Sequence, residues 1–409
     1  MAPPTVILDN GAHSMKVGIA SDGASPKLVP NAIVRGKADK RHYVGDQMDN
    51  CTDFSSLYYR LPFEKGLLVN WGIERTIWDS LFKNVAKIEP KDSRLLITEP
   101  CFNLPAIQDN YDQIVFEEFE FGACFRTIGP ELCLLNDLGE LFGDNQSGSV
   151  AASIPDCALI VDSGYSFTHI VPFLKGKAIP EGVRRINVGG KLLTNQLKEV
   201  VSFRSYDMME ETYIINDVKE KCCFVSKDVY LDLDICKKPL AKNTIIQEYV
   251  LPDFINNKTG HIRTKGADAT VADQQILAMN NERFMIPEIL MHPSDIGLEQ
   301  AGIPEAIVQS VNACDPAIHG LLYANIVLVG GNANIPGYVE RIQQDLRQLV
   351  PIDYEIRIAK PENPVTFAWE GGNRLISLST EKELQKTFVQ RKEYLEYGSD
   401  VCRRKFGSL

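Results

Sequence analysis

The feature that most constrains the fold of this chain is a motif that occurs twice: an apolar strand, an Asp-x-Gly turn and a second apolar strand. The first copy is Val6–Gly11 followed by Val17–Ala20, and the second is Ala158–Gly164 followed by Thr168–Val171. Turns of this kind are common in ordinary hairpins. Their recurrence at the ends of two similar strand pairs is consistent with a duplicated domain.

Strand-like and helical patterns alternate along the chain, which favours an α/β class over an all-α or all-β one. We expect buried strands at Ala158–Asp162 and Ile326–Val329, where the sequence is continuously apolar. We expect helices at Phe116–Cys124 and Gly337–Val350, the second because its apolar residues recur at helical spacing. The polar, lysine-rich stretch Lys237–Asn281 is interpreted as a surface excursion that contains one ordered island, YVLPD (Tyr249–Asp253).

Composition narrows the class of protein. The chain has 409 residues, 44% hydrophobic and 24% charged, with a net charge of −11. This length predicts two or more domains, and the acidic balance argues against a chain that coats nucleic acid unaided. Its 10 cysteines include no C-x-x-C pair, which favours reduced thiols over a zinc site or disulfide framework. Without a signal peptide or an apolar run of about 20 residues, we expect a soluble cytoplasmic or nuclear protein with no membrane contact.

The two Asp-x-Gly turns suggest a site if they face each other across a cleft. Glycine-rich turns expose backbone N–H groups that bind phosphate oxygens. Lys16 would add positive charge, and Asp9 and Asp162 would hold a hydrated divalent cation. Each turn by itself can equally be a plain Asp-Gly turn. A third glycine turn, Gly330-Gly331 between an apolar strand and a helix, favours a nucleotide clamp.

Several longer stretches resemble actin in order and spacing. They include YRLPFEKGLLVNWGIERTIWDSLF (Tyr59–Phe82), NERFMIPEILMHPSDIGLEQAGIPEAI (Asn281–Ile307), LLYANIVLVGGNANIPG (Leu321–Gly337) and the closing Glu370–Gly398. The resemblance covers nearly all of the chain outside the excursion. It implies the actin-like ATPase fold: duplicated ribonuclease-H-like domains in four subdomains around a nucleotide cleft.

The resemblance also implies domain boundaries. The expected subdomains are residues 1–31, 64–152 and 367–409 (subdomain 1), 32–63 with a shortened docking loop (subdomain 2), 153–188 and 298–366 (subdomain 3), and 189–297 with an insertion at about 237–281 (subdomain 4).

The same resemblance implies a site for ATP or ADP with Mg²⁺, in which Asp9 and Asp162 would lie next to the metal. His169 stands at a histidine position of the family. The residues that match the family's nucleotide-binding positions are Asp9, Gly11, Lys16, Asp162, Gly164, Gly190, Lys219, Glu220, Gly330 and Gly331.

The departures from actin concentrate where hydrolysis would occur. Ala12 and His13 replace a hydroxyl-bearing residue and a glycine in the first turn, and Tyr165 replaces a second carboxylate in the other. Gly129-Pro130 stands where actin carries the glutamine that positions the attacking water. We therefore expect no catalytic residue and weak or absent hydrolysis. For His13 itself, a solvent-facing turn residue is the simpler interpretation.

Two further departures argue against self-polymerisation. Only RGKADKRH (Arg35–His42) stands where actin has a longer docking loop, and Asp295 lies among the apolar positions of actin's plug region. A charge there would be costly to bury in a neighbouring subunit.

VDSGYSFTHIVP (Val161–Pro172) and YVLPD (Tyr249–Asp253) resemble a nuclear class within the actin family, whose members serve in chromatin remodellers that exchange a variant histone. This implies a nuclear location, a remodelling ATPase and accessory subunits as partners, among them a zinc-containing companion, and nucleosome contact through the complex. The alternatives are a cytoskeletal ATP-binding protein and a sugar kinase or Hsp70-like ATPase. The basic clusters Arg35–Arg41, Lys258–Lys265 and Cys402–Phe406 either meet DNA phosphates or form solvated surface.

Overall fold

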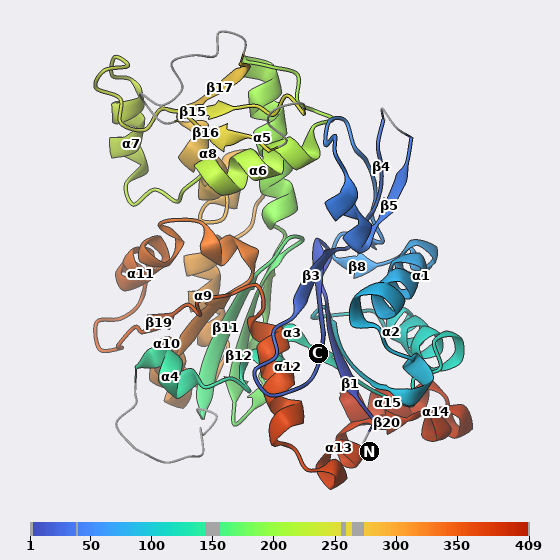
Figure 1. Ribbon diagram of the computed structural model, residues 1–409. Helices are drawn as coiled ribbons and strands as arrows, with labels where there is room; N and C mark the ends of the chain where they lie inside the picture. Colours follow the sequence, from blue (N-terminus) through green and yellow to red (C-terminus); the bar gives the residue numbers. More distant parts are fainter. Residues whose placement is uncertain (1–2, 38–39, 144–155, 255–258, 264–273, 408–409) are drawn as a thin grey trace.

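The computed structural model describes residues 3–37, 40–143, 156–254, 259–263 and 274–407. Two mixed sheets, each of six strands, form the centres of two halves that lie side by side (Figure 1). The order of the first sheet is β20 (Val389–Gln390), β10 (Ala123–Ile128), β9 (Arg94–Glu99), β1 (Thr5–Asn10), β2 (Ser14–Ile19) and β3 (Lys27–Pro30). The order of the second is β13 (Lys177–Ala178), β12 (Thr168–Leu174), β11 (Cys157–Ser163), β18 (Ile326–Val329) and β19 (Ile358–Ala359), with β14 (Arg184–Ile186) on β12.

The two sheets repeat one local plan. In each, an antiparallel hairpin (β1–β2 or β11–β12) has a parallel strand on its other side (β9 or β18). Leu8 lies opposite Val17 in the first hairpin, and Val161 lies opposite Ile170 in the second. The recurring motif therefore marks equivalent places in two related halves, and the α/β fold class predicted from it is confirmed.

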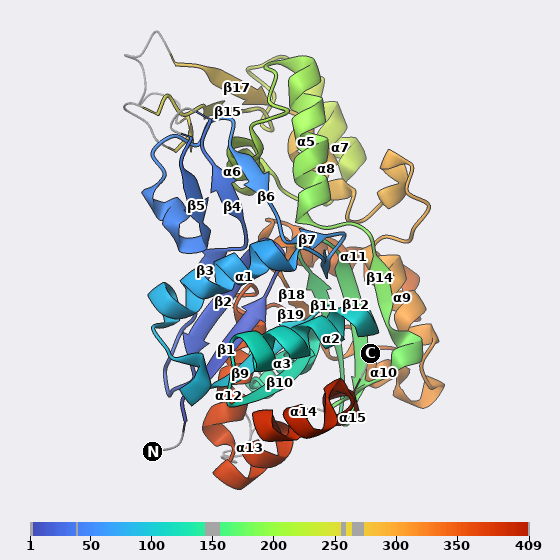
Figure 2. The same cartoon turned by 90° about the vertical axis from the view of Figure 1, so that its right-hand side faces the viewer.

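Helices cover the two sheets. In Figure 2, α2, α14 and α15 lie in front of the first sheet. The helices around the first sheet are α1 (Trp71–Ser80), α2 (Pro105–Gln113), α3 (Gly129–Cys133), α12 (Phe367–Leu378), α13 (Glu381–Thr387), α14 (Arg391–Tyr397) and α15 (Ser399–Phe406). Those around the second are α4 (Leu138–Phe142), α9 (Ile303–Asn312), α10 (His319–Tyr323) and α11 (Tyr338–Leu349).

A smaller group of elements stands above each sheet in Figure 1. Above the first are the strands β4 (Ile33–Arg35), β5 (His42–Val44), β6 (Tyr58–Arg60), β7 (Phe63–Glu64) and β8 (Leu67–Leu68). Above the second are α5 (Gly190–Arg204), α6 (Thr212–Cys222), α7 (Val229–Cys236) and α8 (Glu282–Glu288), with the sheet β16 (His261–Ile262), β15 (Gln247–Val250) and β17 (Ile276–Met279). The exact subdomain boundaries stay a prediction, and the one at 152/153 lies outside the described residues.

The C-terminal part of the chain returns to the first strand. Trp369 on α12 is fully buried, and its indole Nε1 donates a 3.1 Å hydrogen bond to the carbonyl oxygen of Ile7. Gly18 permits this approach, because a Cβ there would lie 2.7 Å from the Trp369 ring. The helix that closes the first half is therefore fixed directly to the strand that carries the first Asp-x-Gly turn.

Most of the expected elements are confirmed, including both strands and the helix now seen as α11. The helix expected over Phe116–Cys124 is wrong. A short π-helical segment covers Ile114–Glu118, and β10 begins at Ala123. β10 pairs in parallel with β9, and five of its six residues are buried. Pairing inside the sheet thus overrides a local sequence that reads equally well as helix.

Part of the island expected at YVLPD forms strand β15, and the excursion around it is more ordered than expected. Tyr249 in the YVLPD segment is fully buried, and β15 pairs with both β16 and β17. The stretch therefore contributes a sheet and core side chains, whereas 255–258 and 264–273 lie outside the described residues. None of the described helices is both long and apolar enough to cross a membrane. The cysteines are free thiols, and all are buried except the half-buried Cys236.

Candidate functional site

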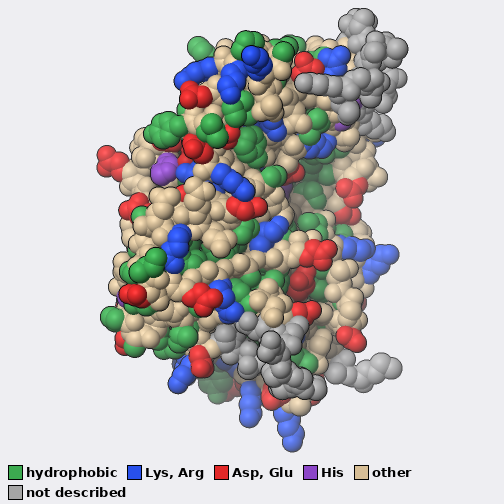
Figure 3. All heavy atoms as spheres, turned by 90° about the vertical axis from the view of Figure 1, so that its left-hand side faces the viewer, with side chains coloured by type: hydrophobic (Ala, Val, Ile, Leu, Met, Phe, Trp, Pro, Cys, Tyr) green, Lys and Arg blue, Asp and Glu red, His purple; other side chains and the backbone are tan. Residues whose placement is uncertain are grey.

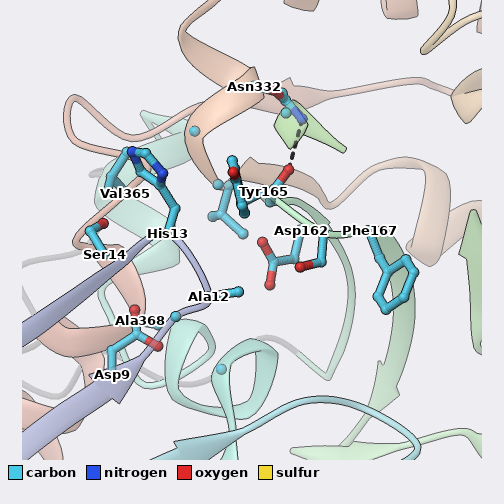
Figure 4. A pocket seen from close by; sticks show the side chains of 18 of the residues that line it. Asp9, Ala12, His13, Ser14, Asp162, Tyr165, Phe167, Asn332, Val365 and Ala368 are labelled. Atoms are coloured by element: carbon cyan, nitrogen blue, oxygen red, sulfur yellow. Dashed lines mark hydrogen bonds between the residues drawn. The ribbon is translucent and has the colours of Figure 1, made fainter. Parts of the chain in front are cut away.

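A cavity of about 610 Å³ lies between the two halves, within the range of roughly 300–1,000 Å³ typical of ligand pockets. Both Asp-x-Gly turns line it, together with the starts of α3 and α5, one face of α6 and the turn after β18 (Figure 4). The structure brings together every residue that the sequence predicted for the site: Asp9, Gly11, Lys16, Asp162, Gly164, Gly190, Lys219, Glu220, Gly330 and Gly331.

In the first loop, the carboxylate of Asp9 is held from two sides. Lys16 Nζ lies 3.1 Å from Asp9 Oδ2, and the Thr98 hydroxyl donates to Asp9 Oδ1 at 2.7 Å. Thr98 in turn accepts the Asn10 backbone N–H at 2.9 Å. The lysine expected to meet phosphates is therefore already paired with the carboxylate expected to meet the metal.

Asn31, which follows β3, anchors the first loop through two hydrogen bonds. Its side-chain amide donates to the Gly11 carbonyl at 3.1 Å, and its backbone N–H donates to the His13 carbonyl at 2.9 Å. The same amide reaches Glu74 Oε1 at 3.5 Å. Glu74 is fully buried, and this burial raises the pKa of its carboxyl group to about 7.

The second loop is held by two other glycine segments. The carbonyl of Gly164 accepts from the Gly190 N–H and from the Asn332 side-chain amide, both at 3.0 Å (Asn332 is labelled in Figure 4). Gly330 has φ +89°, and a Cβ there would lie 2.3 Å from the Ser163 carbonyl oxygen. This position therefore needs glycine both for its backbone conformation and for space.

The hydrogen-bond donors that the loops offer to the cavity come from residues beside the glycines. Gly11 N–H donates to Asp9 O and Gly164 N–H donates to Phe167 O, so both are used inside their own turns. The backbone N–H groups of Ala12 and His13, and those of Tyr165 and Ser166, find no backbone partner among the residues that the structure describes. Such unpaired amides at loop tips suit an anionic ligand.

Lys219 on α6 is buried and internally bonded. Its Nζ donates to Gly190 O at 3.2 Å and to Thr194 Oγ1 and Asn216 Oδ1 at 2.9 Å each. Burial lowers the pKa of this lysine. Asn216 also donates to Glu220 Oε1 at 2.7 Å. Lys219 therefore ties the start of α5 to α6 while it lines the cavity.

His13 and Tyr165, the two departures predicted from sequence, contact each other across the cavity. Their ring centroids are 4.8 Å apart and the planes are tilted by 36° (Figure 4). Partial burial, and then the positive charges of Lys219 and Lys16, lower the pKa of His13 to about 4. The residue nevertheless remains exposed in the cleft. The ring is thus neutral at physiological pH. The interpretation of His13 as a solvent-facing turn residue is correct about exposure and misses this contact.

On the floor of the cavity, burial and then the Asp9 charge raise the pKa of Asp162 to about 6. His169 is buried, and its Nε2 has no hydrogen-bond partner among the residues that the structure describes. Gly129 and Pro130 line the floor with no polar side chain. Within the described part of the chain no group of three His, Cys, Asp or Glu residues could hold a metal. Any divalent cation would therefore depend on Asp9, Asp162 and a ligand's own oxygens.

Two contacts hold the halves together at the upper end of the cleft. The Glu211 carboxylate accepts the Ser56 N–H at 2.8 Å and the Ser56 hydroxyl at 2.7 Å. Beside them the rings of Phe54 and Tyr213 stack at 4.2 Å with 13° between the planes. Sequence reasoning missed these residues because each partner lies far along the chain from the other.

Comparison with known proteins identifies the fold family. The family model described as Actin matches residues 2–407. The chain belongs to the actin family. It is 44% identical to "Actin-like protein ARP6" of Cryptococcus neoformans var. neoformans, over 100% of this chain and 85% of that protein. It is 40% identical to "Actin-related protein 6" of Drosophila melanogaster, over 97% of this chain and 98% of that protein. It is 34% identical to "Actin-related protein 6" of Dictyostelium discoideum, over 98% of this chain and 94% of that protein.

The actin-family assignment confirms the fold predicted from the sequence. The cavity also fits the ligand that this fold implies. It has nucleotide-sized volume, unpaired amides on two facing loops, and two carboxylates for a metal that phosphate oxygens would complete. In this actin-family chain, binding of ATP or ADP stays a prediction.

Proposed function

We propose that this actin-family chain is a non-catalytic structural subunit of a nuclear chromatin-remodelling complex that exchanges a variant histone into nucleosomes. Its similarity to proteins named actin-related protein 6 supports this assignment, together with the resemblance of Val161–Pro172 to the nuclear class. In this role the chain joins a remodelling ATPase to accessory subunits, including a zinc-containing companion, and meets the nucleosome through the complex.

The contact between His13 and Tyr165 carries the non-catalytic part of the proposal. One ring comes from each loop, and together they stand at the loop tips where the unpaired amides lie. His13 is neutral, so it offers no positive charge to a terminal phosphate. Gly129 and Pro130 offer no side chain to position an attacking water. Hydrolysis of a nucleotide depends on such positioning and charge.

We further propose that ATP or ADP with Mg²⁺ serves as a structural ligand. When bound, its phosphates would supply negative charge between the two loops, and Asp9 and Asp162 would face the metal. The amides of the loop tips would hold the phosphates, and Lys219 would add positive charge from α6. A ligand that binds only the folded state stabilises it by mass action.

The alternative is a cytoskeletal ATP-binding protein, which the nucleotide-sized cavity would also suit. Two observations favour the structural subunit. The segment between β4 and β5 is short, and Asp295 is exposed in the turn that follows α8, where a filament contact would have to bury it.

The test is to purify the full chain from its own cells under mild conditions. We expect a remodelling ATPase among the co-purifying proteins, loss of variant-histone exchange when the chain is depleted, and intact nucleotide on denaturation. Phosphate release should stay at the level of a blank, and the protein should remain in the supernatant under conditions that sediment a filament-forming actin. Rapid turnover, or filaments formed by the chain alone, would refute the proposal.

A further inference from the structure

Helix α7 is apolar in sequence but buries none of its side chains. It reads VYLDLDIC, and every residue in it is exposed or half-buried. Tyr230 is 84% exposed and Leu231 57%. A surface helix of a globular protein normally packs its apolar stripe on a core. Among the described residues, α7 is therefore packed less completely than its composition favours.

The described residues cover this helix only in part. The side chains of Val229, Leu233 and Ile235 belong to none of the hydrophobic clusters formed by the described residues. No described helix or strand packs extensively on α7. In Figure 1 this helix lies at the outer edge of the upper part of the second half.

Polar contacts at its two ends hold α7 in place. Asp228 caps the first turn by accepting the Leu231 N–H at 3.0 Å, and the Ser226 hydroxyl donates to Asp232 at 2.6 Å. At the other end, the Asn243 side-chain amide donates to the Cys236 carbonyl at 3.3 Å. Helices shorter than about 12–15 residues are marginal without packing. These contacts present a formed helix, and a partner would stabilise it further.

The turn after α7 carries a further exposed apolar side chain. Leu240 is 67% exposed and lies in the basic sequence KKPLAKN. Figure 3 shows hydrophobic and basic side chains intermingled at the surface over the upper part of this side of the molecule. We call Tyr230, Leu231 and Leu240, with the lysines at residues 227, 238 and 242, the α7 surface.

The charges around α7 indicate what would cover it. Asp228 and Asp232 are used in the contacts above, and Asp234 pairs with Lys237 at 2.8 Å.

The lysines have no such partners. Lys227, Lys238 and Lys242 are exposed, and no ion pair within the described chain engages them. With four lysines and three aspartates between residues 227 and 242, the segment is locally basic on a chain of net charge −11, so its exposed apolar side chains and lysines together are complementary to apolar and acidic groups.

We propose that the α7 surface docks an acidic amphipathic segment of a partner protein. The apolar side chains of that segment would cover Tyr230, Leu231 and Leu240, and its carboxylates would face the three lysines. The inference rests on the proposed function, because it supplies a contact through which a structural subunit holds a partner. Exposed apolar patches rimmed by polar groups are typical of such interfaces.

The first test is site-specific photocrosslinking in the assembled complex. Tyr230 is replaced by p-benzoylphenylalanine in the full chain, and the crosslinked segment is sequenced by mass spectrometry. We expect one partner segment in which Asp and Glu alternate with apolar residues. The matched control carries the same probe at Ile352, which is 88% exposed. Crosslinks to a basic histone tail or to DNA, or a yield no greater than at Ile352, would overturn the proposal.

The second test measures affinity with a synthetic peptide of the captured segment. Tyr230→Ser with Leu231→Ser should weaken binding at least about tenfold, and Lys238→Glu with Lys242→Glu should weaken it and remove its salt dependence. Lys382→Glu with Lys386→Glu, on α13, is the charge-matched control and should bind normally. Equal binding by all variants would refute the α7 surface.

The two proposals can fail separately. If the chain is found in no remodelling complex, the proposed function is wrong. If the chain is in the complex but position 230 stays free of crosslinks there, only the α7 inference is wrong. Circular dichroism of each variant confirms that loss of binding is not loss of fold.

Discussion

The imidazole of His13 and the phenol ring of Tyr165 contact each other across the central cleft, with centroids 4.8 Å apart. Each ring comes from one of the two equivalent hairpin turns, so the contact joins the halves of the molecule at the point where their loop tips meet. Neither ring carries charge at neutral pH, since the pKa of His13 is lowered to about 4 and that of Tyr165 is raised to about 12 by burial. The contact therefore places an uncharged pair of rings where the actin motifs have a glycine and a carboxylate.

Removing this pair should improve nucleotide binding without creating an ATPase. His13→Gly with Tyr165→Asp opens the loop tips and adds a carboxylate near the metal position. We expect affinity for MgATP to rise at least about tenfold by isothermal titration calorimetry, while phosphate release stays at background because Gly129 and Pro130 are unchanged. The single variants provide the double-mutant cycle. Unchanged affinity in the double variant would show that the rings do not restrict the site.

The Glu211–Ser56 contact should keep the upper end of the cleft closed. Glu211→Ala leaves the Ser56 N–H and hydroxyl without their acceptor, so the free energy of unfolding should fall by about 1–3 kcal/mol. Amide hydrogen exchange at Ser56 should accelerate as well. Glu210→Ala is the adjacent control, because within the described part of the chain the ion pair of Glu210 is an exposed one, with Lys37 at 3.6 Å. Similar exchange in both variants would contradict the role given to Glu211.

Adjacent glycines in the turn after β18 should differ sharply in their tolerance of a methyl group. Gly330→Ala places a Cβ 2.3 Å from Ser163 O at φ +89°, whereas a Cβ on Gly331 meets nothing within 4 Å. We expect Gly330→Ala to cost about 2 kcal/mol or more by chemical denaturation. Gly331→Ala should stay within about 0.5 kcal/mol of the parent chain. Equal costs would mean that the turn relaxes freely.

Glu74 should make stability depend on pH. Burial raises its pKa in the folded state to about 7 from the ordinary value of 4.5, so the folded state holds the proton more tightly than the unfolded state. This stabilising contribution is complete below about pH 4.5 and is lost as the pH rises through 7.

Replacing Glu74 removes this dependence. Glu74→Gln keeps the shape without ionising, so it should be more stable than the parent chain at pH 8, by about 2–3 kcal/mol, with a smaller gain at pH 5. Thermal melts across this range provide the measurement, with exposed Glu299→Gln as the control. A constant difference between variant and parent at all pH values would exclude Glu74 as the titrating group.

Local sequence was sufficient to locate the loops but not to show what holds them. The Asp-x-Gly turns and the Gly330 turn follow uninterrupted apolar strands, and such strands fix where a turn must come. Thr98, which positions Asp9, and Asn332, which holds the second loop, carry no motif of their own. Each lies far along the chain from the loop it bonds, and only the pairing of β1 with β9 and of β11 with β18 brings them close.

The sequence by itself determined the duplicated α/β plan, the actin family and ten of the residues that line the cleft, because strand periodicity, glycine turns and family motifs are local properties. The tertiary structure decided that β10 is a strand where a helix was expected, that Lys16 pairs with Asp9, and that His13 meets Tyr165. It also left the apolar side chains of α7 incompletely covered by the described residues. These outcomes depend on which segments lie side by side in space, since burial, ion pairing and aromatic contact are properties of neighbours that the linear order of residues does not specify.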